Sequence, residues 1–246
     1  MTPKGAKALN INRQIISTRA GLARVATPYA VKTRTDLILT GRHLLDAYSP
    51  HVERGPILVT NVTTRDPDLA VRIPYWICDF LYMGRTEDLR FVFDAPLFGP
   101  SDFAYARAQS DCSRYCPNVV SIFPPEVYFG LRLLKLFRPD VRQPVDLRDA
   151  EQMSREVFWD FLIDHLLVVD TEGAGLRSIK YPLPFPNHAV MVKSGKWRVM
   201  RSLRGSPIEG PGRALVRWAT QFEYLTRRGG EKLSDAAKVL LRGCSK

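Results

Sequence analysis

The sequence predicts an α/β fold in which helices flank a mixed sheet. Segments with apolar residues at helical spacing alternate along the chain with short runs rich in β-branched and aromatic residues. Of the 246 residues, 45% are hydrophobic and 25% are charged, which is an ordinary globular composition. We therefore expect a single domain over residues 1–246, long enough to bury a sizeable core.

The first part of the chain reads as a helix followed by a strand. Ile11, Ile15 and Leu22 recur at helical spacing and predict a helix over residues 11–25, which ends before Pro28 because proline cannot continue a helix. A strand over residues 29–34 follows. Further along we expect strands over residues 57–62 and 73–82 and helices over residues 86–93 and 126–137.

The C-terminal part, residues 138–246, is predicted to be helical and irregular. A proline-bearing connector over residues 138–148 leads into an amphipathic helix over residues 154–169. Short strands are expected over residues 189–192 and 196–201, and a terminal helix over residues 212–227.

The formal net charge of +11 favours anionic partners. The chain has no basic run of about five to eight residues, and it has no basic stripe interleaved with aromatic residues. We therefore expect that the protein does not bind nucleic acid. The remaining partners are a phosphate-rich substrate or a membrane surface, and the alternative is a solvated basic face. No apolar run approaches about 18 residues, so we expect a cytoplasmic protein, with peripheral contact to an anionic inner membrane.

The segment from Lys32 to Asp36 lies where the first predicted strand ends. Ligands of open α/β sheets bind at the carboxyl ends of strands, so an acid there is well placed for a ligand. Asp36 could hold Mg²⁺ or Mn²⁺ against a diphosphate, and Lys32 or Arg34 could contact the phosphates directly. The structural alternative is an aspartate that caps a turn or helix.

Three blocks of the chain, at residues 10–36, 77–88 and 125–128, resemble the WavE lipopolysaccharide-synthesis family. Residues 10–22 are similar to its pattern N-x-x-R-Q-I-x-S-T-x-x-G-L, and residues 29–36 to Y-x-x-K-x-R-S/T-D. Residues 77–88 resemble I-S-D-x-x-x-x-G-x-T-E-D, with Cys78 at the serine position, and residues 125–128 resemble P-E-x-Y. The order of the blocks agrees over a family-like core at residues 10–137.

The resemblance implies a glycosyltransferase of GT-A type with a Rossmann-like core. It would move a sugar from a nucleotide-sugar donor to a lipopolysaccharide, lipid-linked or oligosaccharide acceptor. Arg13, Lys32, Arg34 and Asp36 would bind the donor diphosphate, with Asp36 as the ligand of a divalent Mn or Mg cation. GT-A enzymes usually carry Asp-x-Asp at this strand end, and the single Asp36 leaves metal dependence open; Asp66-Pro67-Asp68 matches the pattern but lies in a polar turn outside the resembling blocks.

Two further acids are candidates for activating the acceptor hydroxyl. Asp79 lies in an apolar and aromatic stretch, which can raise the proton affinity of a carboxylate and suits a general base. Its structural alternative is a cap beside the sheet. Glu126 begins an apolar helix, and its alternative is stabilisation by the helix dipole. If Asp36 and Asp79 act together, both should face one pocket.

Only 35 residues precede Asp36, whereas one βαβ unit takes about 30 or more residues. We therefore expect the first βα units of a GT-A domain to be missing, which would leave the apolar face of the first helix unusually exposed. The rival function is a non-catalytic assembly protein, derived from such an enzyme, that binds a glycan or a partner.

Overall fold

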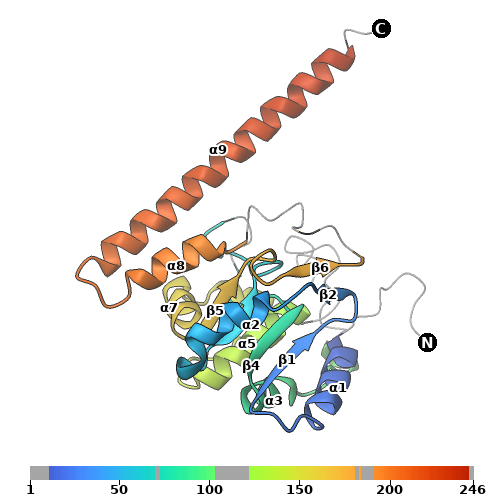
Figure 1. Ribbon diagram of the computed structural model, residues 1–246. Coiled ribbons are helices and arrows are strands. Elements are labelled where there is room, and N and C mark those ends of the chain that lie inside the picture. The colour runs from blue at the N-terminus through green and yellow to red at the C-terminus, as the bar shows by residue number, and fades with distance from the viewer. Residues whose placement is uncertain (1–10, 70–72, 103–121, 181–182, 184–190, 244–246) are drawn as a thin grey trace.

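The computed structural model describes residues 11–69, 73–102, 122–180, 183 and 191–243 (Figure 1). Its centre is a four-stranded sheet in the order β1-β4-β3-β5. Two further strands pair with each other apart from this sheet. The strands are β1 (Tyr29–Thr33), β2 (Leu37–Leu39), β3 (Ile57–Thr60), β4 (Leu81–Arg85), β5 (Leu166–Val169) and β6 (Leu176–Ser178).

The central sheet is mixed, as the sequence predicts. Strand β4 runs antiparallel to both β1 and β3, while β3 and β5 are parallel, with Ile57 opposite Leu166. Strand β1 lies at one edge of the sheet, and a short turn leads from its carboxyl end into β2, which pairs with β6. The α/β class with a mixed sheet and flanking helices is thus confirmed.

The helices pack on one another as well as on the sheet. Among the contacts between elements, α3 lies against α1 and α5, α7 against α5 and β5, and α8 against β5, α7 and α9. In Figure 1, most of α9 projects alone from the body. The helices are α1 (Ile11–Leu22), α2 (His43–Tyr48), the 3-10 helix η1 (Ser49–Arg54), α3 (Thr86–Phe93), α5 (Pro125–Phe137), α6 (Leu147–Glu151), α7 (Arg155–His165), α8 (Ser194–Ser202) and α9 (Glu209–Gly243).

The apolar face of α1 is covered, contrary to the expectation of an exposed face. Ile11, Ile15 and Leu22 are buried in the main hydrophobic core, which also takes in α3, α5 and α7. The helix packs against α3, and Arg90 of α3 donates to the carbonyl of Leu22 at its C-terminal end. These contacts supply the apolar partner that we expected to be missing.

Three sequence-based assignments are wrong. Of the expected strand over residues 73–82, only residues 81 and 82 belong to a strand, the start of β4. The chain before them turns at Tyr75, whose φ is +64°, and Ile77 N donates to the carbonyl of Glu126 instead of to a neighbouring strand. The expected helix 154–169 ends at His165, and its last four residues become β5. The short apolar run there is compatible with either structure, and parallel pairing with β3 decides for the strand.

The third wrong assignment is the strand over residues 196–201, which is part of α8. Trp197 and Met200 are buried at a spacing of three, which is a helical period. The expected strand 189–192 lies partly outside the described residues, and Met191 forms an isolated bridge with Arg65. The predicted helices 86–93 and 126–137 are confirmed, and the terminal helix is longer than predicted.

A glycine contact in the core yields a first prediction. A Cβ atom at Gly130 of α5 would lie 1.9 Å from the Tyr75 carbonyl oxygen, a backbone atom that cannot move aside cheaply. We expect Gly130→Ala to lower the free energy of unfolding by about 2–4 kcal/mol in urea denaturation. Gly21→Ala is the matched control, because a Cβ in that helical position meets nothing within 4 Å. Equal stability of both variants would contradict this packing.

Candidate functional site

A pocket of about 700 Å³ lies beside the carboxyl end of β1. Helix α1 forms one wall, the turn after β1 forms another, and the chain leaving β6 closes a third side. All four residues predicted to bind a diphosphate line this pocket. Its charged and amide side chains are Arg13, Gln14, Lys32, Arg34, Asp36 and Lys180.

Lys180 was not predicted, because it lies in the part of the chain that resembles no known motif. Pairing of β2 with β6 carries it to the pocket, and Ile179 N donates to the Asp36 carbonyl at 2.9 Å. No local sequence signal marks such a long-range neighbour. Gln14 was also missed, although it lies inside the block from residue 10 to 22 that resembles the family pattern.

Arg34 and Asp36 form a bidentate ion pair on the pocket wall. Arg34 Nε and Nη2 donate to the two carboxylate oxygens at 2.9 and 2.8 Å. This hydrogen bonding lowers the pKa of Asp36 below its ordinary value, so the carboxylate stays ionised. The guanidinium also lies over the ring of Phe80, 4.4 Å from its centroid, which fixes the plane of the fork.

Lys32 lines the pocket with its stem but turns its ammonium inward. Its Nζ donates to the backbone carbonyl of Asp79 and lies 5.6 Å from the ring centroids of Tyr82 and Phe93. Burial lowers the pKa of Lys32, and the nearby Asp79 charge acts in the opposite direction. Lys32 therefore links the pocket wall to the buried segment that holds Asp79.

Asp79 lies beneath the pocket instead of lining it, so the expectation that it shares the open pocket with Asp36 is wrong. The residue is 2% exposed, and its Oδ2 accepts a 2.7 Å hydrogen bond from Gln14 Nε2. Within the described part of the chain, its Oδ1 has no hydrogen-bond partner. An unpaired buried carboxylate oxygen is costly, so this atom is available to a donor that the protein itself does not supply.

Glu126 is a half-buried second acid that lies close enough to Asp79 to interact with its charge. It lies in the first turn of α5, and Ile77 N donates to its backbone carbonyl. Burial and the Asp79 charge raise the pKa of Glu126 to about 7, with smaller opposing effects from Arg65 and Arg34. A carboxyl with this pKa can exchange a proton near neutral pH, which is the property that general acid–base chemistry needs.

The aspartates of the Asp-Pro-Asp segment serve the structure. Lys196 Nζ lies 2.5 Å from Asp66 Oδ2, and both carboxylates are fully buried. Arg217 donates to both oxygens of Asp68, at 2.8 and 2.7 Å, and Trp159 Nε1 donates to one of them. These aspartates therefore anchor α8 and α9 to the body of the protein.

The residues around Asp36 do not fit a divalent cation in this arrangement. Both oxygens of Asp36 accept from Arg34, and the other charged groups of the pocket wall are cations. Among the residues that the structure describes, no cluster of three or more histidine, cysteine, aspartate or glutamate side chains could hold a metal ion. A metal role for Asp36 stays a prediction.

The raised pKa of Glu126 predicts an unusual dependence of stability on pH. Because the folded pKa lies above the ordinary 4.5, the folded state binds more protons, and stability should fall as the pH rises from about 4.5 to 7. We expect this group to remove roughly 3 kcal/mol over that window. Urea denaturation across it should show the loss in the wild type and not in Glu126→Gln. The exposed Glu87→Gln, at the start of α3, should behave as the wild type; an identical profile for Glu126→Gln would contradict the assignment.

Comparisons with known proteins bear on the pocket and on the whole chain. Neither a curated protein nor a solved structure matches the sequence. A protein-family model matches residues 2–215, which include every candidate residue of the pocket and of the carboxylate pair beneath it. The suspected resemblance is confirmed, and it points to a role in lipopolysaccharide synthesis. The chain belongs to the family described as WavE lipopolysaccharide synthesis.

Proposed function

We propose that this protein is a GT-A-type glycosyltransferase that moves a sugar from a nucleotide donor to a lipopolysaccharide or another surface-glycan acceptor. One observation carries the proposal: a pocket lined by four basic residues shares Gln14 with the buried carboxylate of Asp79, whose charge acts on Glu126. The basic residues are Arg13, Lys32, Arg34 and Lys180. A diphosphate and a hydroxyl acceptor need these two opposite environments side by side.

The donor diphosphate would bind on the basic wall. Arg13 is exposed on α1. The orientation of the Arg34 guanidinium is already fixed by its contacts with Phe80 and Asp36. A planar guanidinium matches phosphate oxygens bidentately. As the sugar leaves, negative charge grows on the nucleoside diphosphate, and prepositioned cations stabilise that charge without reorganising.

The acceptor would be activated by the carboxylate pair. A hydroxyl oxygen forms a bond to the anomeric carbon of the sugar while the bond from that carbon to the diphosphate oxygen breaks, and its electrons leave with the nucleoside diphosphate. Glu126 or the free Oδ1 of Asp79 takes the hydroxyl proton. Gln14 lies between the pocket and Asp79, so its side chain has to rotate before an acceptor reaches this carboxylate.

The second candidate is a non-catalytic protein of glycan assembly that binds a glycan or a partner. It is favoured by the burial of Asp79 under Gln14 and Lys32, since an acid closed off from the pocket cannot touch a substrate bound there. Both candidates predict anion binding in the pocket. Turnover separates them.

The donor site predicts a loss of diphosphate binding when its central arginine is removed. Titrating the protein with inorganic pyrophosphate, UDP and GDP by calorimetry, we expect Arg34→Ala to weaken binding by about 10–100-fold, the loss of one charge-assisted contact. Arg42→Ala removes an arginine that immediately precedes α2 and whose side chain is 83% exposed, and it should bind as the wild type. Similar affinities for both variants would exclude the basic wall as the phosphate site.

The acceptor site predicts a separation of binding from turnover. With a panel of nucleotide sugars and a glycan acceptor, release of nucleoside diphosphate should be about 10²–10⁴-fold slower for Glu126→Gln, the usual contribution of a general base. Pyrophosphate binding should not change, because Glu126 does not line the pocket. In the wild type, turnover should fall as the pH drops below about 7, since the base becomes protonated. Diphosphate binding without turnover in the wild type would favour the non-catalytic alternative.

A further inference from the structure

The outer face of α9 carries a stripe of large apolar side chains. Leu215, Trp218, Phe222 and Leu225 are between 58% and 64% exposed. Their spacings of three and four residues place them on one side of the helix. The rings of Trp218 and Phe222 stack, with their centroids 5.6 Å apart. Exposed apolar stripes of this kind mark a surface that meets a partner.

The body of the protein cannot cover this stripe, because another face of α9 already holds the body. Arg213 contacts Asp160, and Arg217 and Gln221 contact Asp68. These three residues of α9 are four apart and share one face. At about 100° per residue, the centre of the apolar stripe lies roughly 120° around the helix from that face.

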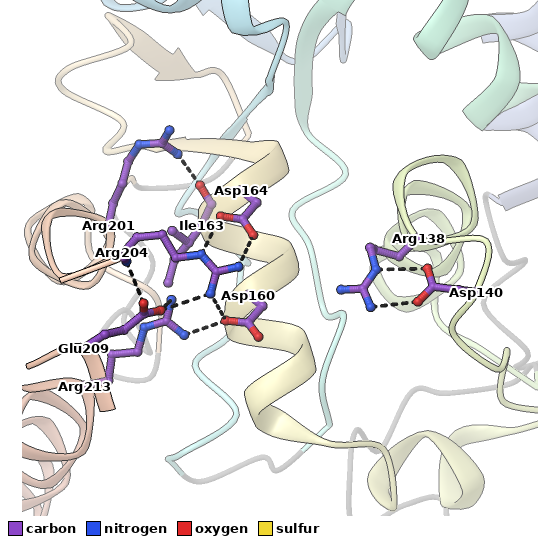
Figure 2. Close-up of polar contacts among 10 residues, drawn as sticks. Arg138, Asp140, Asp160, Ile163, Asp164, Arg201, Arg204, Glu209 and Arg213 are labelled. Atoms are coloured by element: carbon purple, nitrogen blue, oxygen red, sulfur yellow. Dashed lines mark hydrogen bonds and ion pairs between the residues drawn. The ribbon is translucent and has the colours of Figure 1, made fainter. Parts of the chain in front are cut away.

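The base of the helix is also held firmly. In Figure 2, Arg204 reaches Asp160 and Asp164 of α7 and Glu209 at the start of α9, at distances from 2.7 to 3.0 Å for the closest contacts. Arg213 adds contacts of 2.6 Å to Asp160 and 2.8 Å to Glu209. The direction of α9 is thus set by ion pairs, and the stripe is presented outward.

The net charge of the C-terminal residues indicates the chemistry of the partner that would cover the stripe. Residues 193–246 contain 13 lysines and arginines and four aspartates and glutamates, so they carry +9 of the net charge of +11. Several of these cations pair with the body, but residues 226–246 still contain six basic and two acidic residues. A basic helix with an aromatic and aliphatic stripe is the pattern of a helix that lies in the interface of an anionic bilayer.

We propose that α9 is an interfacial helix that lays the stripe from Leu215 to Leu225 into the surface of an anionic membrane. A second copy of this chain fits less well, since a coiled coil needs its heptad repeat sustained, and the next heptad positions are Gly229 and Lys232. None of the described helices is long and apolar enough to cross a bilayer. The family match ends at residue 215, so most of the stripe lies beyond the matched residues, and the proposal does not rest on the proposed function.

Vesicle binding by the full chain tests the proposal. We expect roughly tenfold more protein to sediment with vesicles of phosphatidylcholine and phosphatidylglycerol than with phosphatidylcholine alone, and high salt should reduce this excess. The double variant Trp218→Ser/Phe222→Ser should lose roughly tenfold or more of the binding. The control Leu45→Ser/Val145→Ser removes exposed apolar side chains from other elements and should bind as the wild type.

Fluorescence then locates the contact. The other three tryptophans, Trp76, Trp159 and Trp197, are buried, so a blue shift and protection from iodide on vesicle binding report on Trp218. Trp218→Phe should lose this signal but keep its sedimentation with vesicles. Equal binding to neutral and anionic vesicles, or unchanged binding of the double serine variant, would overturn the proposal. So would a concentration-dependent dimer in lipid-free buffer that the same variant abolishes, because the stripe would then belong to a second copy.

Discussion

A buried lysine at the end of β1 is the constraint around which the site is arranged. A lysine that is 7% exposed needs compensation for its charge, and Lys32 finds it in the carbonyl of Asp79, the Asp79 charge and two aromatic rings. This contact holds the irregular segment before β4 against the edge strand. Gln14 then ties α1 to the same aspartate. Helix α1, strand β1 and the segment before β4 are therefore held together by contacts that meet at Asp79.

The same arrangement separates two electrostatic environments. The basic groups of Arg13, Arg34 and Lys180 line the open pocket, whereas Asp79 is buried, and desolvation together with the Asp79 charge acts on Glu126. Water screens the charges of the pocket side chains. Asp79 and Glu126 interact where screening is poor, which explains the raised pKa of Glu126. Gln14 lies between the two environments. Any chemistry that joins them depends on movement of this side chain.

Ion pairs attach the C-terminal helix α9 and the chain before it to the body. Asp66 and Asp68 are buried with Lys196 and Arg217, and the carboxylates of α7 bind Arg204 and Arg213. Paired buried charges contribute little net stability, but removing one partner is expensive, so such networks fix geometry. Here the network directs α9 away from the body and leaves its aromatic face uncovered. Basic side chains thus have two roles in this protein. In the pocket they line a cavity, and on α9 they attach the helix to carboxylates of the body.

The sequence alone determined what depends on local periodicity and short motifs: α1, β1, α3, α5, and the pocket residues Arg13, Lys32, Arg34 and Asp36. These predictions are correct because the residues on which each one depends lie close together in the sequence. Tertiary structure decided the rest. Pairing with β3 turned the apolar run after His165 into a strand, and pairing of β2 with β6 delivered Lys180. Whether Asp79 faces the pocket or the interior depends on Lys32 and Gln14, 47 and 65 residues away in sequence, and no local pattern encodes contacts made over such distances.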